Sequence, residues 1–328
     1  MKTIPEGSSY TRRDFVGLMA LAGTGALAGL ASPGRAAQPA AGAPEGPTSI
    51  HVFSKPLQWL SYDEAAALIA GAGYGGMDLS VRPGGHVLPE NVERDLPRAV
   101  EAARKAGLKV ELITTAIVSA TDPFTERILG TASQLGVKCY RLGYVSYDNQ
   151  AGIWASLQKH KAAFKSLAEV NARFGIHGAY QNHSGVRVGG PVWDLHELVR
   201  DLDPRWFGVQ YDVRHATAEG GESWPVGFRL LAPWIRCTDI KDFRWQQSPG
   251  KGVIEDVPMG EGIVNYDLYF KLVRELKVAG PMSVHFEYPP FERQKEPLPA
   301  DRKRALFAVA MKKDLAVLKA CMAKHTVA

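Results

Sequence analysis

A repeated order of short apolar run, glycine-stopped helix and next apolar run constrains the fold of this chain more than any other feature. Segments of helical period end at Gly73, Gly107, Gly136 and Gly175, and an apolar run follows each glycine within a few residues. Glycine is the residue that most readily ends a helix in the left-handed conformation. Strands that alternate with helices in this way predict a parallel sheet with helical crossovers.

The repeat runs from residue 50 to residue 323. The predicted strands are Ile50–Phe53, Gly76–Leu79, Lys109–Ile113, Lys138–Leu142, Ile176–Tyr180, Trp206–Tyr211, Trp234–Thr238 and Met282–Phe286. The predicted helices are Asp63–Ala72, Asn91–Ala106, Phe124–Leu135, Trp154–Phe174, Val192–Leu202, Val226–Leu231, Tyr266–Leu276 and Ala300–Ala323. Eight such units in roughly 250 residues are typical of a (β/α)8 barrel. A doubly wound sheet is the alternative, but no glycine-rich phosphate-binding turn follows Phe53. The sequence therefore predicts an α/β fold, a single-domain TIM barrel over residues 48–328.

The residues before the barrel have the layout of an export signal. Arg12 and Arg13 are followed by Asp-Phe, as in the twin-arginine motif, and an apolar run then extends from Val16 to Leu30. That run is shorter than the ~20 residues of a spanning helix. We therefore expect a twin-arginine-type signal peptide over residues 1–37 and a flexible linker over residues 38–47. The expected location is periplasmic or otherwise exported, with no stable membrane span after signal removal.

Charge and cysteine content exclude two other classes of protein. The formal net charge is +5, but the Lys and Arg residues are scattered rather than gathered in a basic run, so no nucleic-acid partner is expected. The chain has three cysteines, an odd number, and two of them (Cys139 and Cys237) fall in predicted strands. Buried free thiols are therefore expected instead of a disulfide framework.

Polar side chains follow the predicted strands where the active site of a parallel barrel lies. They are Asp78, Arg82 and His86, then Arg141 and Tyr144, then Gln181, Asn182 and His183, then Asp212, Arg214 and His215, then Asp239, Lys241 and Asp242, then His285 and Glu287. A single acid at a strand end is often only a helix cap, and a lone histidine is more often structural than a ligand. Amide, imidazole and carboxylate groups at four successive strand ends nevertheless suit Mn²⁺, Mg²⁺, Co²⁺ or Zn²⁺.

These motifs resemble the xylose-isomerase-like barrel superfamily, the sugar phosphate isomerase/epimerase family, over residues 48–322. Asp212-x-x-His215 is similar to the metal-binding Asp and substrate-binding His of ketose 3-epimerases, and Glu287 falls on their last metal ligand. Met259–Tyr266 resembles their Gly-Glu-Gly-Ile-x-Asp-[WY] segment. Two positions depart from the pattern. Gln181 replaces a carboxylate that serves as ligand and base, and Asp239 replaces a usual His ligand.

The resemblance implies an enzyme that removes a proton next to the carbonyl of a sugar or sugar-derived compound. One divalent metal ion is expected, held by Gln181, Asp212, Asp239 and Glu287, with His183 as a substitute for Gln181. The implied catalytic residues are Glu287, His183, His215 and Lys241, and the implied substrate-binding residues are His86, Arg141, Arg214 and His215. The expected partner is a small-molecule carbohydrate, and a homo-oligomer is left open.

Three alternatives remain open from the sequence. A neutral amide at Gln181 cannot take up a proton, which favours a lyase or hydratase on a keto-sugar over the two-carboxylate epimerase reaction. The DNA-repair endonuclease IV branch of the superfamily needs more metal-binding histidines than the strand ends provide. A barrel that binds carbohydrate without catalysis is the third alternative, and it is also motivated by Gln181 and Asp239.

Overall fold

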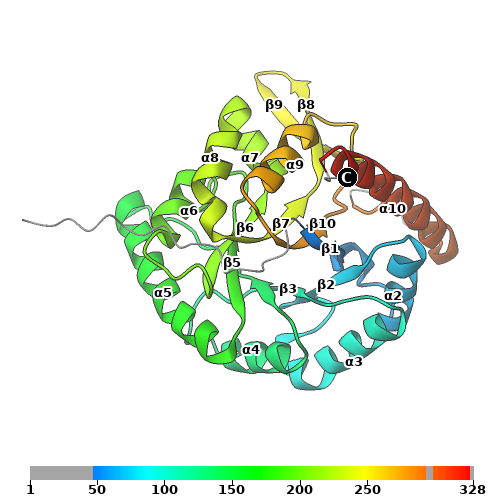
Figure 1. The fold of residues 1–328 in the computed structure, drawn as a ribbon, viewed down its shortest axis with the longest axis horizontal. Helices are drawn as coiled ribbons and strands as arrows, with labels where there is room; N and C mark the ends of the chain where they lie inside the picture. The colour runs from blue at the N-terminus through cyan, green and yellow to red at the C-terminus, as the bar shows by residue number, and fades with distance from the viewer. Residues whose placement is uncertain (1–46, 293–297, 326–328) are drawn as a thin grey trace, which may run out of the picture. The chain divides into compact units, whose positions relative to one another are not determined.

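The computed structural model describes residues 47–292 and 298–325, and eight parallel strands in them close into a barrel in the order β1-β10-β7-β6-β5-β4-β3-β2 (Figure 1). These strands are β1 (Pro47–Phe53), β2 (Gly76–Val81), β3 (Leu112–Thr115), β4 (Cys139–Arg141), β5 (His177–Gln181), β6 (Phe207–Asp212), β7 (Ile235–Ile240) and β10 (Gly280–Val284). The predicted single-domain TIM barrel is confirmed. The predicted signal peptide and linker lie outside the described residues, except Pro47, which begins β1.

Helices surround the strands on the outside of the barrel (Figure 1). They are α2 (Tyr62–Gly71), α3 (Val92–Lys105), α4 (Thr125–Gln134), α5 (Ile153–Phe174), α6 (Val192–Val199), α7 (Val213–Gly220), α8 (Trp224–Leu231), α9 (Tyr266–Glu275) and α10 (Ala300–Ala323). Short 3-10 turns lie at Lys55–Leu57, Pro89–Asn91, Gly221–Ser223 and Ala232–Trp234. Within the described residues, no helix is both long and apolar enough to cross a membrane.

Local sequence signals set several helix ends. Ser61 begins α2 by accepting a hydrogen bond from the backbone N–H of Glu64, whose carboxylate in turn accepts one from the backbone of Ser61. The four glycines predicted to stop helices all have positive φ, and Gly175 ends α5 in the left-handed conformation at φ 65°. Only glycine adopts that conformation without a steric penalty. These positions explain why the alternation of elements is readable from the sequence.

Two elements were not predicted. A two-stranded antiparallel hairpin, β8 (Asp242–Ser248) and β9 (Lys251–Val257), follows β7 and projects beyond the ring of helices near α7 and α9 (Figure 1). Helix α7 begins immediately after Asp212, where only a connection was expected. The hairpin was missed because its strands lack the continuous apolar runs of the barrel strands.

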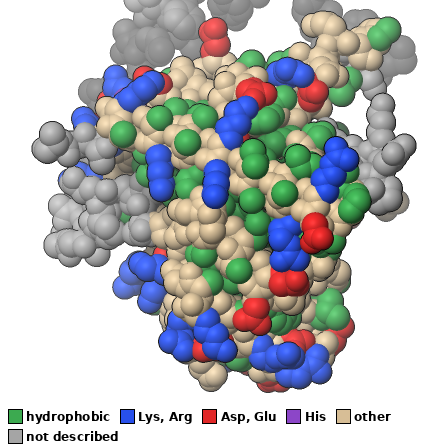
Figure 2. Space-filling view, turned by 90° about the vertical axis from the view of Figure 1, so that its right-hand side faces the viewer, with side chains coloured by type: hydrophobic (Ala, Val, Ile, Leu, Met, Phe, Trp, Pro, Cys, Tyr) green, Lys and Arg blue, Asp and Glu red, His purple; other side chains and the backbone are tan. Residues whose placement is uncertain are grey.

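The barrel is packed with apolar side chains between strands and helices. Tyr140, Tyr180 and Tyr211 are fully buried, each on a different strand. Cys139 and Cys237 are buried in β4 and β7, Cys321 lies in α10, and all three thiols are free, as predicted. On the face drawn in Figure 2, Lys and Arg side chains are spread among acidic and apolar ones, which agrees with a scattered basic excess.

Candidate active site at the carboxyl ends of the strands

Five strands bring polar side chains together at their carboxyl ends. Arg141, Gln181 and Asp212 are the last residues of β4, β5 and β6, and Asp239 lies one residue before the end of β7. The parallel register places Asp212 beside Asp239. His285 and Glu287 follow β10, which lies on the other side of β7. Closure of the barrel therefore gathers residues that are more than 140 positions apart in the sequence (Arg141 to Glu287).

Gln181 occupies the centre of a hydrogen-bond network. Its amide nitrogen donates to Asp212 Oδ2 at 3.0 Å and also to Asp239 Oδ2. Its amide oxygen accepts from Arg141 Nη1 at 3.0 Å and from the Tyr144 hydroxyl. The donors and acceptors around it fix the orientation of the amide, because the reverse orientation would direct N–H groups at a guanidinium and an oxygen at two carboxylates.

Lys241 places a positive charge between two carboxylates. Its Nζ lies 3.0 Å from Glu287 Oε2 and 3.4 Å from Asp212 Oδ2. The Lys241 side chain is 4% exposed and that of Asp212 is 0% exposed, whereas the Glu287 side chain is 23% exposed. Burial would lower the pKa of Lys241, but Asp212 and then Glu287 outweigh it and raise that pKa above its ordinary value. Lys241 is therefore an ammonium at neutral pH.

The same neighbours determine the charge of Glu287. Burial would raise its pKa, but Lys241 and His285 outweigh burial and hold the pKa well below the usual range. Burial raises the pKa of Asp212, against the attraction of Lys241. Among the carboxylates at these strand ends, Glu287 is thus both ionised and partly open to solvent.

His285 links Asp239 to Glu287. Its Nε2 lies 3.2 Å from Asp239 Oδ1, and its Nδ1 lies 3.8 Å from Glu287 Oε1. Burial would lower the pKa of His285, but Asp239 above all raises it to about 9. Phe53 stacks on the imidazole with ring centroids 4.6 Å apart. The ring is therefore a cation that lies between the Asp239 and Glu287 carboxylates.

His215 and His183 form a neutral pair next to Asp212. Their ring centroids are 3.9 Å apart. His215 Nδ1 accepts a hydrogen bond from Arg214 Nη1 at 2.9 Å and lies 2.8 Å from the Ser184 hydroxyl. Because Nδ1 is an acceptor, the ring proton lies on Nε2, which is 3.5 Å from Asp212 Oδ2. Burial and then Lys241 lower the pKa of both rings, to about 4 for His183.

His183 has an assignable tautomer. Its Nδ1 lies 2.9 Å from the Ser184 carbonyl oxygen, which can only accept, so Nδ1 carries the proton. Nε2 then has a free lone pair. The edge of this ring lies against Tyr144, with centroids 5.0 Å apart. His183 can therefore accept a hydrogen bond from a substrate hydroxyl.

Three residues singled out in the sequence have other surroundings. His86 Nε2 lies 3.0 Å from the Leu60 carbonyl oxygen, and the His86 ring contacts Tyr62. Neither partner belongs to the hydrogen-bond network around Gln181. Asp242 accepts four backbone N–H groups at the start of the hairpin and the Gly-Glu-Gly segment. Asp78 accepts from the Thr114 and Ser283 hydroxyls inside the barrel, and burial raises its pKa to about 7.

The structure adds residues that sequence reasoning did not assign to the site. Gln210 donates to Asp239 Oδ1, Asp256 of β9 pairs with Arg214, and Phe53 lies under Arg141 and His285. Both Phe53 and Gln210 lie in predicted strands. Phe53 is apolar and Gln210 lies inside its strand, so neither was recognised as a functional residue. Asp256 belongs to the hairpin that was not predicted.

The predicted metal ligands do not form a cation-binding set in this arrangement. Within the described residues, no group of three or more His, Cys, Asp or Glu side chains is placed to hold a metal ion. Gln181 directs N–H groups, not its oxygen, at Asp212 and Asp239. Lys241 already lies between Asp212 and Glu287. The donor set in this arrangement therefore does not fit a divalent cation.

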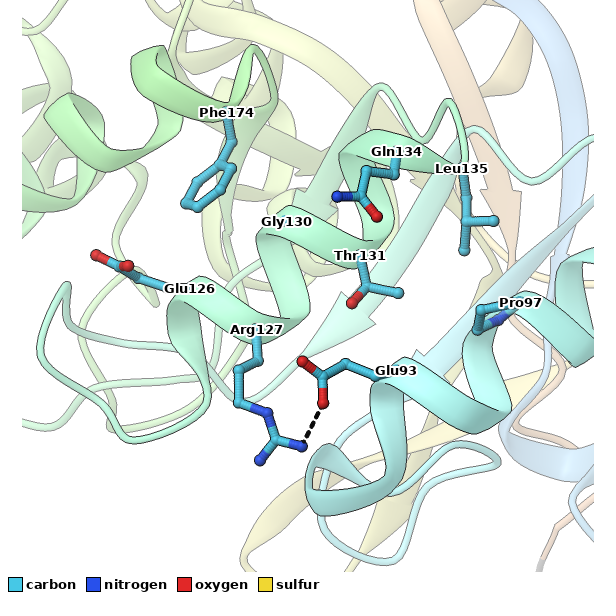
Figure 3. Close-up of a pocket in the computed structure, with 9 residues that line it drawn as sticks. All are labelled: Glu93, Pro97, Glu126, Arg127, Gly130, Thr131, Gln134, Leu135 and Phe174. Carbon is cyan, nitrogen blue, oxygen red and sulfur yellow. Dashed lines mark hydrogen bonds and ion pairs between the residues drawn. The ribbon is translucent and has the colours of Figure 1, made fainter.

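A separate hollow on the outside of the barrel carries none of these groups. Its volume is about 390 Å³, and it lies between α3, α4 and the end of α5 (Figure 3). Arg127 and Glu93 form an ion pair across it at 2.8 Å. Such a surface groove between helices is a packing feature, and we keep the strand ends as the candidate active site.

The family of the chain follows from its sequence together with this fold. The model of the xylose isomerase-like TIM barrel family matches residues 66–308. The chain belongs to this family. The superfamily resemblance noted in the sequence is thereby confirmed, while no curated protein sequence matches the chain.

Solved structures of the same fold are similar at low sequence identity. The IOLI protein with a bound zinc atom has a TM-score of 0.65 and 16% identity, with 85% of this chain and 100% of that chain covered. D-psicose 3-epimerase from Clostridium cellulolyticum H10, with D-tagatose, has a TM-score of 0.62 and 11% identity, with 84% and 99% covered. The probable 3-DHS dehydratase AsbF from Bacillus anthracis has a TM-score of 0.60 and 16% identity, with 80% and 97% covered. At these identities the similarity establishes a shared fold.

Proposed function

We propose that the chain is an enzyme that removes a proton next to the carbonyl group of a sugar or sugar-derived compound. The observation that carries the proposal is the Lys241 ammonium, 3.0 Å from the partly open Glu287 carboxylate. A carbonyl oxygen that binds at Lys241 places its α-carbon near Glu287. The ammonium then stabilises the negative charge that develops on the oxygen as the proton leaves.

Each neighbouring residue has a role in this proposal. Glu287 takes up the proton, and the His183 lone pair accepts a hydrogen bond from a substrate hydroxyl. Arg141 and Tyr144 hold Gln181, which in turn separates Asp212 from Asp239. Arg214 positions His215 by donating to its Nδ1. His86, predicted as a substrate-binding residue, stays a prediction.

The single open carboxylate favours some reactions over others. Isomerisation and β-elimination need one carboxylate base, whereas a two-carboxylate epimerisation needs a second one facing the substrate. The second position is held by Gln181, an amide whose oxygen accepts from Arg141 and Tyr144. We therefore place a lyase or isomerase before an epimerase. Similar folds include both a D-psicose 3-epimerase and a probable 3-DHS dehydratase, which supports testing the two kinds of product together.

We also propose that the enzyme is exported, and the proposed proton abstraction uses no bound metal ion. The paired arginines and the apolar run before the barrel support a periplasmic or otherwise exported enzyme. A divalent cation at Gln181, Asp212, Asp239 and Glu287 would require Lys241 and the Gln181 amide to rearrange. If sugars bind but no proton is exchanged, the protein binds carbohydrate without catalysis.

The test is a screen of keto- and aldo-sugars in D₂O, followed by proton NMR. Loss of the signal of a hydrogen next to the carbonyl reports proton abstraction, and new vinyl or isomer signals report the later step. We expect Glu287→Gln to slow deuterium uptake by about 10² to 10⁴. Lys241→Met is expected to slow it by about 10² to 10³ through loss of a charge at the developing oxyanion.

Glu261→Gln is the matched control, because Glu261 lies outside this network and pairs with Lys313 at the surface. Full activity of Glu287→Gln would contradict the assignment of Glu287 as the base. Equal losses of activity in Glu287→Gln, Lys241→Met and Glu261→Gln would also contradict it.

A further inference from the structure

We infer that the centre of this barrel is a metal-independent site, in which the ammonium of Lys241 takes the position between the strand ends that a divalent cation would need. Cation binding is measured without substrate. A failure of this inference can therefore be told apart from a failure of the proposed reaction.

The Lys241 side chain occupies the position that a bridging cation would need. Its Nζ contacts Asp212 Oδ2 at 3.4 Å and Glu287 Oε2 at 3.0 Å, and these are two of the four predicted metal ligands. The backbone of Lys241 is also held, because its carbonyl oxygen accepts a hydrogen bond from Tyr266 at 2.8 Å. The ammonium bridges the carboxylates of Asp212 on β6 and Glu287 after β10. It therefore supplies the electrostatic attraction that a bridging metal ion would supply.

The orientation of the Gln181 amide also opposes metal binding. A metal ligand must present an oxygen, but the Gln181 oxygen accepts from Arg141 at 3.0 Å and from Tyr144. If the amide turned, its N–H groups would face the Arg141 guanidinium and leave two donors opposed in a buried space. A buried donor without an acceptor costs about 1 to 3 kcal/mol. The network therefore opposes the one rotation that would create a ligand.

Asp239 is saturated with donors from the protein. Its Oδ2 accepts from Gln181, while its Oδ1 accepts from Gln210 and faces His285 Nε2 at 3.2 Å. Both oxygens are thus occupied by protein donors. Lys241 lies between Asp212 and Glu287, and the Arg141 guanidinium lies at the same strand ends, so a divalent ion would enter a site whose negative charge is largely compensated.

The test compares Mn²⁺ binding to the full purified chain and to variants, by electron paramagnetic resonance of free Mn²⁺ and by thermal unfolding. For the wild-type chain we expect no stoichiometric Mn²⁺ binding and the same Tm in EDTA and in about 1 mM Mn²⁺. The double variant Lys241→Met/Gln181→Glu removes the ammonium and restores an anionic oxygen. It is expected to bind Mn²⁺ at least tenfold more tightly than wild type, with a Tm raised by about 3 °C or more in Mn²⁺.

Lys271→Met is the control, since Lys271 is 59% exposed on α9 and its removal changes the charge of the chain without touching the site. It should bind Mn²⁺ as wild type does. If the double variant does not unfold cooperatively, the Mn²⁺ affinity of Lys241→Met alone is compared with that of wild type. One Mn²⁺ bound per wild-type chain, or a folded variant without gain in affinity, would overturn the inference.

Discussion

Asp212 combines a helix cap with contacts to the candidate site in one side chain. Its Oδ1 accepts the backbone N–H of His215 at 3.0 Å and so caps α7, while its Oδ2 faces Gln181, Lys241 and His215 Nε2. The helix cap considered in the sequence is therefore present, and the assignment of Asp212 to the active site stays a prediction. A strand-end carboxylate can serve both roles because its two oxygens point to different neighbours.

Asp242 has a purely structural surrounding by comparison. Its Oδ1 accepts from Phe243 and Val264, and its Oδ2 accepts from Gly260 and Gly262. We predict that Asp242→Asn lowers the free energy of unfolding by about 2 to 3 kcal/mol, because the new NH₂ group leaves two backbone donors without an acceptor. Urea unfolding measures the loss.

Glu261→Gln is the control for Asp242→Asn, because Glu261 lies between Gly260 and Gly262, whose N–H groups donate to Asp242. The Glu261 side chain is 46% exposed, so its pair with Lys313 contributes little. Its free energy of unfolding should stay within about 0.5 kcal/mol of wild type. Equal effects of the two substitutions would show that the Asp242 carboxylate does not anchor the loop.

At the scale of elements, the β8–β9 hairpin is tied to the site through one buried ion pair. Arg214 of α7 pairs with Asp256 of β9, and the two side chains are 5% and 4% exposed. The same guanidinium donates to His215 Nδ1 and lies over the Phe243 ring of β8 at 5.1 Å. The hairpin therefore helps to set the orientation of a site histidine.

We predict that Asp256→Asn loosens the hairpin and α7 together. Removal of one partner leaves a buried guanidinium without its counter-charge, which costs about 3 to 5 kcal/mol in fully buried pairs. Hydrogen exchange of β8, β9 and α7 should become at least tenfold faster. The adjacent Glu255→Gln is the matched control, because Glu255 pairs with Arg244, which is 51% exposed, and its exchange should match wild type. Unchanged exchange in Asp256→Asn would contradict the coupling.

For the whole molecule, buried histidines make stability depend on pH. His51 of β1 and His177 of β5 are both buried. Burial lowers the pKa of His51 to about 4 and that of His177 to about 3. His51 Nε2 accepts the backbone N–H of Glu111 at 3.3 Å, so this ring must be neutral at that nitrogen.

The direction of the pH effect follows from these pKa values. In the unfolded chain a histidine has a pKa near 6.5, so the unfolded state takes up protons first as the pH falls. The stabilisation is complete above about pH 6.5 and is lost as the pH falls toward the folded pKa. We expect each of these histidines to cost about 2 kcal/mol of unfolding free energy between pH 7.5 and pH 5.

Urea unfolding of wild type and His177→Gln at several pH values tests this prediction. The variant lacks one titrating group, so its loss of stability between pH 7.5 and pH 5 should be smaller by about 2 kcal/mol. His51→Gln should behave in the same way. Parallel pH profiles in wild type and both variants would refute the assignment.

The sequence by itself determined the barrel and the positions of most site residues. Glycine stops and apolar runs are local signals, and the carboxyl ends of parallel strands meet by geometry. Gln181, Asp212, Asp239 and Glu287 could therefore be assigned to one end of the barrel from the order of residues alone. The hairpin and α7 were missed because neither has a distinct apolar period.

Only the tertiary structure decided how those residues meet. Whether the Gln181 amide presents oxygen or nitrogen to the carboxylates depends on Arg141 and Tyr144. Whether Lys241 pairs with Asp212 and Glu287 depends on closure of the barrel. Such pairings join residues far apart in the sequence, and hydrogen-bond orientation is set by every neighbour in space. A motif read along the chain therefore predicts which groups are present at the site, while their charges and partners follow from packing.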